Sequence, residues 1–537
     1  MIPHEMMVQM YLTQQETVKV LTAQLEAMQK QNQKLQSSID ELNLQIRILT
    51  QQRFGRKTEK LDKNQLSLFD SEDAEVFNET ELLTEEGILG ESELETVTYT
   101  RKKPTGKRDL DLSLLEVVVE PTITLSDEEL KERFPKGYKC LPDEVYRMVE
   151  HVPEKLVVHE YHIAVYAGKD DDGVIKGKRP EKLLKNSYLT PSLAAAVFDM
   201  KFVNHLPYNR IGEDFKRKDA VISRQVMAGW MIRVTDRYLR PLYRALHQKI
   251  LDSKLIHCDE TPFTLIDNGR GPGTKDYMWV YHTCEKYDSK PVFVYEYQPG
   301  RSKDMPAKFL EGYKGYLVTD GYQVYHSLEN ERPDELKVAG CWTHLRRKFV
   351  EIVKAGKLSA SGSTAEEAVS RIATIYHVDN MMKDKECDER LKHRQQSVQP
   401  LVDEFFTWIK EISEEPLDKG GKLSAAINYA LNQEKYLRTF LENGMIPLDN
   451  NDAERSIKNF CVGKHSWHVI DSKAGAETSG MLYSIAETAK ANGLKPYEYF
   501  KYVLEFMLEH QDDAPTSYIN EIVPWSDKIP DSCRKTK

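Results

Sequence analysis

The sequence predicts an α/β fold in which helices cover a mixed sheet of short strands. Short runs rich in β-branched and aromatic residues alternate with turns between residues 255 and 341. Segments with helical periodicity flank these runs on both sides. Acidic residues, Asp259 and Asp320, stand at the ends of two of the runs. At 537 residues the chain is long enough for three or more domains of roughly 100–200 residues each.

Residues 1–60 are predicted to form a coiled coil followed by a basic segment. Isoleucine at a with leucine at d favours a parallel pair, and a single asparagine, Asn32, at an a position fixes register and strand number. We therefore expect a homo-oligomer, at least a dimer; a long helix folded onto its own domain is the alternative. The a positions are Val18, Leu25, Asn32, Ile39 and Ile46, and the d positions are Leu21, Met28, Leu35, Leu42 and Leu49.

An acidic linker and a small β-containing domain follow. Residues 70–95 hold eleven carboxylates and no Lys or Arg, which is typical of a flexible linker, assigned here to 61–109. Residues 110–185 include the strand-like run 155–166 and a turn at 169–173. Cys140 is the only cysteine of this domain, whereas a structural zinc needs four ligands, so we expect no structural zinc.

Residues 186–250 are predicted to be a helical DNA-binding region. Residues 201–250 carry eleven Lys or Arg against four Asp or Glu. One helix is expected over 206–215 and a second after Ser223, a good N-cap residue. Such a pair resembles a helix-turn-helix that offers Arg224 and Gln225 to a groove, although generic helix pairs are also common.

Residues 251–500 are predicted to be the catalytic domain. Three strands are expected at 255–258, 277–283 and 291–297, then a helix at 303–310 and two more strands at 316–319 and 337–341. This order, with carboxylates on the first and fourth strands, is that of a ribonuclease-H-like core. Residues 501–537 form a C-terminal tail.

Asp259 is preferred over Glu260 as the site residue of the first strand. Neighbouring strand residues point to opposite faces, so both acids cannot enter one site while the strand continues, and Pro262 is expected to close it. Carboxylates gathered together repel unless a cation neutralises them, and oxygen ligands suit Mg²⁺ or Mn²⁺. We expect two such ions. Any single acid here is explained by ordinary turn chemistry, so the claim depends on the set.

Long motifs throughout the chain resemble those of bacterial transposases of the insertion sequence 66 family. They are HCDETP, WVYHT, YQPGRS, YLVTDGYQVY, AGCWTHLRRKF, PLDNNDAERSIKNFCVGKHSW and SIAETAKANGLKPYEY. The resemblance implies a DDE transposase with the triad Asp259, Asp320 and Glu454, together with small accessory proteins of the same element. Asp449, Asp452 and Glu487 are rival third ligands that periodicity alone does not exclude.

The separation of Asp320 from Glu454 is 134 residues, too long for one strand and one helix, so a helical insertion is expected at about 360–445. Basic residues lie near the proposed site, where they either contact DNA phosphates or form solvated helix faces. They are Arg346, Arg347, Lys348, Arg455, Lys458 and Lys464. Many members of the family carry a C-x-x-C pair in the small domain, and this chain departs from them there.

The function expected from these features is cleavage of transposon ends and joining of the freed 3′-hydroxyls to target DNA. Two alternatives stay open: a nuclease of the same fold without strand transfer, and a catalytically inactive coiled-coil regulator that binds DNA. No apolar run is long enough for a membrane helix, and the seven cysteines form no C-x-x-C pair. We therefore expect no membrane partner and a location in the bacterial cytoplasm, associated with the nucleoid.

Overall fold

The computed structural model describes residues 155–167, 174–176, 178–267, 269, 274–284, 288–356, 363–414 and 421–535. Several predictions lie outside these residues. They concern the coiled coil and basic segment of residues 1–60, the acidic linker of 61–109 and most of the small domain, including Cys140. The domain boundaries given above stay predictions.

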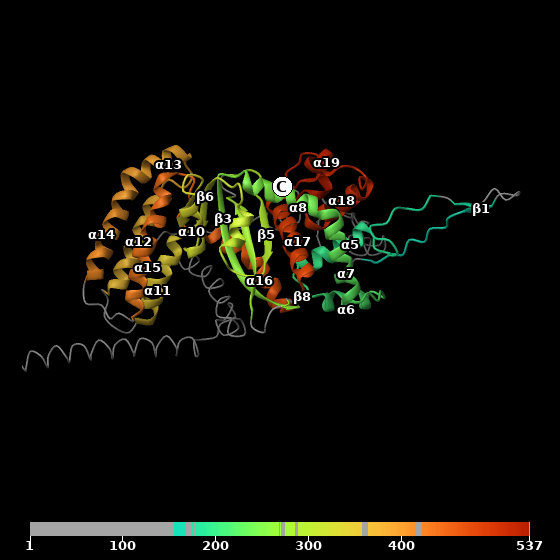
Figure 1. Cartoon of the computed structure of the whole chain (residues 1–537), viewed down its shortest axis with the longest axis horizontal. Helices are drawn as coiled ribbons and strands as arrows, with labels where there is room; N and C mark the ends of the chain where they lie inside the picture. The colour runs from blue at the N-terminus through green and yellow to red at the C-terminus, as the bar shows by residue number, and fades with distance from the viewer. Residues whose placement is uncertain are drawn as a thin grey trace, which may run out of the picture.

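A mixed sheet of six strands forms the centre of the molecule (Figure 1). Its main order is β5-β4-β3-β6-β7, and β8 pairs with the far end of β3. β3, β4 and β5 are antiparallel neighbours, while β6, β7 and β8 run parallel to β3 or to one another. This arrangement confirms the predicted mixed α/β class. The strands are β3 (Leu255–Asp267), β4 (Asp276–Thr283), β5 (Phe293–Gln298), β6 (Gly315–Thr319), β7 (Leu336–Gly340) and β8 (Val469–Ser472).

The first strand is longer than the sequence suggested, and the prediction that Pro262 closes it was wrong. Pro262 lies inside β3, opposite Tyr277 of β4. On its other edge β3 pairs with β6 at residues 255–257 and with β8 at 264–267. Pro262 falls between these two ladders, where that edge has no strand partner among the described residues. A residue without an N–H is tolerated at such a place.

The edge strand β5 is covered by helix α17 (Lys473–Ala491). The hydroxyl of Ser484 accepts a hydrogen bond from the Tyr295 amide at 2.7 Å, and that of Thr488 accepts from the Phe293 amide at 3.0 Å. An exposed strand edge offers unpaired amides to other chains, so these hydroxyls satisfy groups that would otherwise be open. Helix α17 thereby fixes the residues that follow the candidate site to the sheet.

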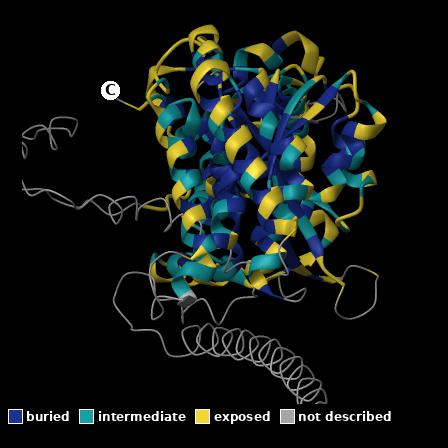
Figure 2. Ribbon diagram, turned by 90° about the vertical axis from the view of Figure 1, so that its left-hand side faces the viewer, coloured by how far each residue is buried: buried dark blue, intermediate teal, exposed yellow. Residues whose placement is uncertain are grey.

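Helices lie on both sides of the sheet, and the buried residues are concentrated between them and the strands (Figures 1 and 2). On one side, helices from before and after the sheet in sequence share one apolar core with it. These are α5 (Pro191–Phe198), α6 (Tyr208–Arg217), α7 (Arg224–Val234), α8 (Arg240–Leu251), α17, α18 (Pro496–Glu509) and α19 (Pro515–Ile522). Shorter helical turns join or follow them at Asp199–Val203, Thr235–Leu239 and Asp531–Cys533.

On the other side, a block of helices occupies the long interval between β7 and Glu454 (Figure 1). It has its own apolar core, and its buried Asp379 pairs with Arg390 and Arg394. Helix α11 (Trp342–Gly356) joins this core to the sheet. The block comprises α12 (Thr364–Asn380), α13 (Cys387–His393), a turn at Arg394–Val398, α14 (Gln399–Glu414), α15 (Lys422–Arg438) and a turn at Thr439–Glu442. Two further helices, α9 (Asp304–Phe309) and α10 (Gln323–Glu331), connect strands of the sheet.

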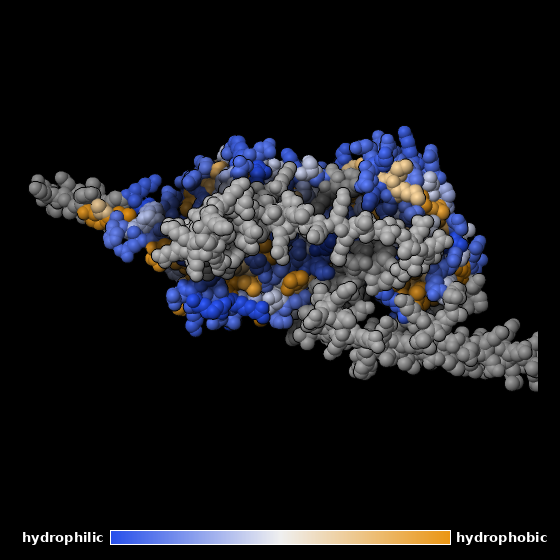
Figure 3. Space-filling view, turned by 180° about the vertical axis from the view of Figure 1, so that it is seen from behind, coloured by the Kyte–Doolittle hydropathy of each residue, from blue (hydrophilic) through white to orange (hydrophobic). Residues whose placement is uncertain are grey.

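An arm leads away from this body toward the hairpin of β1 (Val165–Ala167) and β2 (Val174–Lys176) (Figure 1). The sequence predicts a strand over 155–166, but strand structure begins only at Val165. Val157 and Val158 are 69% and 92% exposed. Figure 3 shows hydrophobic side chains gathered on this arm, whereas most of the described surface in that view is hydrophilic. Without a neighbouring strand to cover these side chains, the first half of the run does not pair.

The helices that the structure describes include none that is long and apolar enough to cross a membrane.

Candidate active site

Asp259 and Glu260 face opposite sides of β3, as strand alternation requires. Glu260 is buried and its Oε1 accepts hydrogen bonds from Arg301, from Nε at 2.7 Å and from Nη2 at 2.6 Å. The Tyr325 hydroxyl donates to the other oxygen at 3.2 Å. Glu260 therefore belongs to a buried ion pair, which fits its separation from the proposed metal ligands. Thr261 continues the strand and is not part of a loop.

Asp320 follows β6 directly and is held by a tight turn. Its Oδ1 accepts a hydrogen bond from the Tyr322 amide at 2.9 Å, and its carbonyl accepts one from the Tyr429 hydroxyl at 2.9 Å. Gly321 has a φ of 92°, and a Cβ there would lie 2.8 Å from the Tyr429 hydroxyl. The turn thus needs glycine for both conformation and space. Helix α15 of the helical block, through Tyr429, helps to position this carboxylate.

Glu454 lies in the first turn of helix α16 (Asn451–Trp467), and Asn450 fixes the start of that helix to β3. The Asn450 Oδ1 accepts from His257 Nδ1 at 2.8 Å, and its Nδ2 donates to the Cys258 carbonyl at 2.8 Å. Asn450 occupies the predicted cap position, yet its side chain makes no capping hydrogen bond. It binds the neighbouring strand instead and sets where Glu454 stands.

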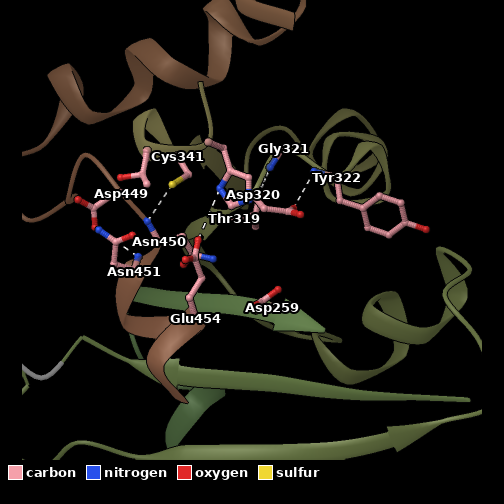
Figure 4. A network of polar contacts seen from close by, with 12 residues as sticks. Asp259, Thr319, Asp320, Gly321, Tyr322, Cys341, Asp449, Asn450, Asn451 and Glu454 are labelled. Carbon is pink, nitrogen blue, oxygen red and sulfur yellow. Dashed lines mark hydrogen bonds and ion pairs between the residues drawn. The ribbon is translucent and has the colours of Figure 1, made fainter. Parts of the chain in front are cut away.

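The carboxylates of Asp259, Asp320 and Glu454 come from β3, the end of β6 and α16, and point toward one region (Figure 4). Burial, followed by the neighbouring Glu260 and Asp320 charges, raises the pKa of Asp259 well above its usual range. His344 of α11 lies beside this group: its Nδ1 is 3.6 Å from Glu454 Oε1, and Asp320 acts on its pKa. The three acids, 61 and 134 residues apart in sequence, therefore form one electrostatic cluster.

The cluster fits a divalent cation. Glu454 Oε1 is buried and has no hydrogen-bond donor among the described residues. The donor atoms are carboxylate oxygens, which Mg²⁺ and Mn²⁺ prefer. Bringing acids together in a partly buried place costs free energy unless a cation offsets their repulsion. A cation held by Asp259, Asp320 and Glu454 would relieve both the unsatisfied oxygen and the repulsion.

The raised pKa values predict how stability depends on pH. Burial and Asp320 raise the pKa of Glu260 to about 7, and the pKa of Asp259 is raised as well. An acid with a raised pKa in the folded state binds more protons when folded than when unfolded. The free energy of unfolding of the metal-free protein should therefore fall as pH rises from about 4.5 through 7. Denaturant titrations should show this fall, and saturating Mg²⁺ or the Asp259→Asn variant should reduce it; a metal-free protein whose stability rises over that range would contradict it.

The rival third ligands lie in other surroundings. Asp452 pairs with Arg455. Glu487 on α17 accepts hydrogen bonds from Asn459 at 2.8 Å and Lys490 at 2.6 Å. Asp449 precedes the helix and accepts from the Asn451 amide at 3.3 Å. Of these four acids, Glu454 is the one that lies beside His344 and the cluster (Figure 4).

The predicted DNA-contacting residues differ in accessibility. Arg224, Gln225, Lys348 and Arg455 are exposed, whereas Arg346, Arg347 and Lys458 are half-buried. Lys348 lies over the Tyr429 ring, 4.5 Å from its centre. Lys464 is different: it is 6% exposed and its ammonium donates to the Pro262 carbonyl at 2.8 Å. The proposed phosphate contact of Lys464 finds no support in this geometry, because a cation turned into the core is not offered to DNA.

The sequence interpretation missed Cys341 and His344. One ligand atom of each lies within 4.8 Å of the others and of Glu454. Cys341 ends the run after β7 and also accepts a hydrogen bond from the Asn450 amide at 3.2 Å. A Cys and a His three residues apart at the start of a helix fall on one face, and this spacing was a signal available in the sequence.

Comparison with known families agrees with this arrangement of sheet, helical block and acids. A model described as the Transposase IS66 family matches residues 186–478, and one described as the IS66 C-terminal element matches 484–525. A third, described as Transposase C of IS166 homeodomain, matches 41–119. These matches define a DNA-processing enzyme of the transposase class. The chain belongs to the IS66 family of transposases.

The homeodomain-like match implies DNA binding near the N-terminus. It spans the stretch interpreted above as an acidic linker, so the limits of that linker stay a prediction. Relatives are found in Sinorhizobium fredii, and all three named here are uncharacterized. The protein y4qI is 25% identical over 494 residues, covering 90% of this chain and 88% of the relative. The protein y4hP is 24% identical over 501 residues with the same coverage, and y4jD is 28% identical over 363 residues, covering 66% and 70%.

Proposed function

We propose that this protein is a DDE transposase with a ribonuclease-H-like core, which cleaves the ends of its element and joins the freed 3′-hydroxyls to target DNA. The observation that carries the proposal is the convergence of Asp259, Asp320 and Glu454 from two strands and a helix. The sheet order β5-β4-β3-β6-β7, with the first three strands antiparallel, supports the ribonuclease-H-like assignment.

The three acids would hold two divalent cations, Mg²⁺ or Mn²⁺. Such ions, when bound, activate a water or a 3′-hydroxyl and stabilise the leaving oxygen of a phosphodiester. The chain's own part is to hold the carboxylates where the ions and the phosphodiester must meet. Asn450 holds the start of α16 against β3, and the turn at Gly321 holds Asp320. His344, 3.6 Å from Glu454, lies where it can orient that carboxylate.

A nuclease without strand transfer is the second candidate, because the same acids serve hydrolysis. An inactive DNA-binding regulator is the third, and the presence of all three carboxylates in one cluster disfavours it. A purified-protein assay with labelled end DNA and a target plasmid separates the three. Joined products support the transposase, cut ends alone support the nuclease, and uncut but bound DNA supports the regulator.

We place element-end recognition partly on the helix pair α6 and α7. The hydroxyl of Ser223 caps α7 by accepting from the Val226 amide at 3.3 Å, which leaves Arg224 and Gln225 exposed in its first turn. In helix-turn-helix proteins the N-terminal residues of the second helix contact base edges. The coiled coil would bring two such surfaces together, and accessory proteins of the element would join the complex.

Replacing Arg224 with alanine should weaken binding to end DNA by about 1–3 kcal/mol, roughly 5- to 150-fold, because an arginine–base or arginine–phosphate contact is lost. Fluorescence anisotropy with labelled end DNA at fixed salt measures it. Lys314→Ala is the matched control, since Lys314 is 70% exposed and pairs with Glu335 in the turn before β6. Equal affinities for Arg224→Ala and Lys314→Ala would remove α7 from the interface.

A further inference from the structure

A second group of potential metal ligands lies on the same face of β3 as Asp259. His257 is two residues before Asp259 and pairs across the sheet with His282 of β4. One ligand atom each of His257, Cys284 and Asp452 lies within 4.8 Å of the other two. The three residues come from β3, the residue after β4 and the first turn of α16. They bring together an imidazole, a thiol and a carboxylate, unlike the oxygen-only set of the candidate active site.

Both histidines direct a ring nitrogen into the buried interior without a hydrogen-bond partner. His257 and His282 are 0% and 1% exposed, and their rings stack with centres 4.8 Å apart. His257 uses Nδ1 to bind Asn450 Oδ1, and His282 uses Nδ1 to bind the Thr283 carbonyl at 2.9 Å. Both acceptors are oxygens, so each Nδ1 carries the proton and each Nε2 keeps its lone pair. Neither Nε2 has a hydrogen-bond partner within the described part of the chain.

A buried nitrogen without a partner costs free energy, and a metal ion satisfies such a nitrogen well. A second-shell acceptor such as Asn450 is the usual device for fixing the tautomer of a metal-ligating histidine. Nitrogen and sulfur ligands with one carboxylate select a borderline-soft ion such as zinc over Mg²⁺. The cation that competes for this place is Arg455, which pairs with Asp452 and is 60% exposed at its side chain.

We propose that His257, Cys284 and Asp452 bind one zinc-class divalent ion, with His282 stacked behind His257 as the nearest further nitrogen donor. The ion would tie the first turn of α16 to β3 and β4, next to Glu454. It is a positioning site for the candidate active site and is separate from it, because Asp259 lies two residues, roughly 7 Å, further along the strand.

This proposal departs from the expectation of no structural zinc. That expectation concerned residues 110–185 and the absence of closely spaced Cys or His pairs. The ligands proposed here are 27 and 168 residues apart in sequence, at positions 257, 284 and 452. No local spacing rule detects such a set, because the sheet and the return of α16 to it bring the residues together.

Cobalt binding tests the proposal in the full-length protein. Chelator-stripped protein is titrated with Co²⁺ in excess Mg²⁺, which occupies the oxygen-ligand site, and sulfur-to-cobalt charge-transfer absorption is followed. We expect one Co²⁺ per chain with this absorption, displaced by Zn²⁺. Asp452→Asn should weaken Co²⁺ binding by at least about tenfold, and Cys284→Ser should abolish the absorption. Asp259→Asn should leave the absorption intact, which separates this site from the candidate active site.

Two cysteine controls guard the interpretation. Cys533→Ser changes an equally buried cysteine near the C-terminus and should keep the absorption. Cys341→Ser should also keep it; loss of the absorption in that variant alone would place the ion at Cys341, His344 and Glu454 and overturn the proposal. Absence of the absorption in the wild-type protein would overturn it as well, whatever the folding of any variant.

Discussion

Replacing Glu454 with glutamine should reduce strand transfer by at least about 10²–10³-fold while leaving the affinity for end DNA within a factor of about two. The substitution keeps the size of the side chain but removes the negative charge that a cation requires. Because Glu454 Oε1 has no hydrogen-bond donor among the described residues, the neutral amide breaks no hydrogen bond of that atom. Asp259→Asn and Asp320→Asn should show losses of the same order.

Glu487→Gln is the matched control for this result. Glu487 is also a buried glutamate on a helix that packs against the sheet, at 8% exposed against 4% for Glu454. It accepts hydrogen bonds from Asn459 and Lys490, far from Asp320 in the hydrogen-bond network. Joining and cleavage are measured together on the same labelled DNA. Normal activity in Glu454→Gln with loss in Glu487→Gln would move the third ligand to α17.

Replacing Asn450 with alanine should destabilise the protein by about 2–4 kcal/mol and lower strand transfer more than end binding. Asn450 is fully buried and joins α16 to β3 through His257 and the Cys258 carbonyl. Its removal leaves a buried donor and a buried acceptor unsatisfied, and it frees the first turn of the helix that carries Glu454. Denaturant unfolding and the joining assay measure the two effects.

The neighbouring Asn451→Ala variant is the control for this substitution. Asn451 is 6% exposed, and its Oδ1 has no hydrogen-bond partner among the described residues. Its truncation should cost less than that of Asn450, since no bond of that oxygen is lost. If the two variants were equally stable and equally active, the bridge from Asn450 to β3 would not be what positions Glu454.

The sequence predicted the strands well because each is a short apolar run bounded by turn residues. The runs at 277–283 and 316–319 correspond closely to β4 and β6. It failed at Pro262, where the end of one ladder and the start of another allow a proline inside a long strand. That information resides in the pairing of distant segments and not in the local pattern.

The candidate site was only partly readable from sequence. Strand alternation separated Asp259 from Glu260, and the ion pair of Glu260 with Arg301 fits that choice. The choice of Glu454 needed the family resemblance, because Asp449 and Asp452 have the same local setting. The roles of Asn450 and His344 were hidden, since both act across the 134-residue interval that the helical block fills.

The most direct test of the central claim is a strand-transfer assay with purified full-length protein, pre-cut end DNA bearing a free 3′-hydroxyl, a target plasmid and Mg²⁺. The account predicts covalent joining of the 3′-hydroxyl to target DNA, dependent on the divalent ion and lost in Asp259→Asn, Asp320→Asn and Glu454→Gln. End DNA that is bound but never joined under these conditions, or joining that persists in all three variants, would contradict it.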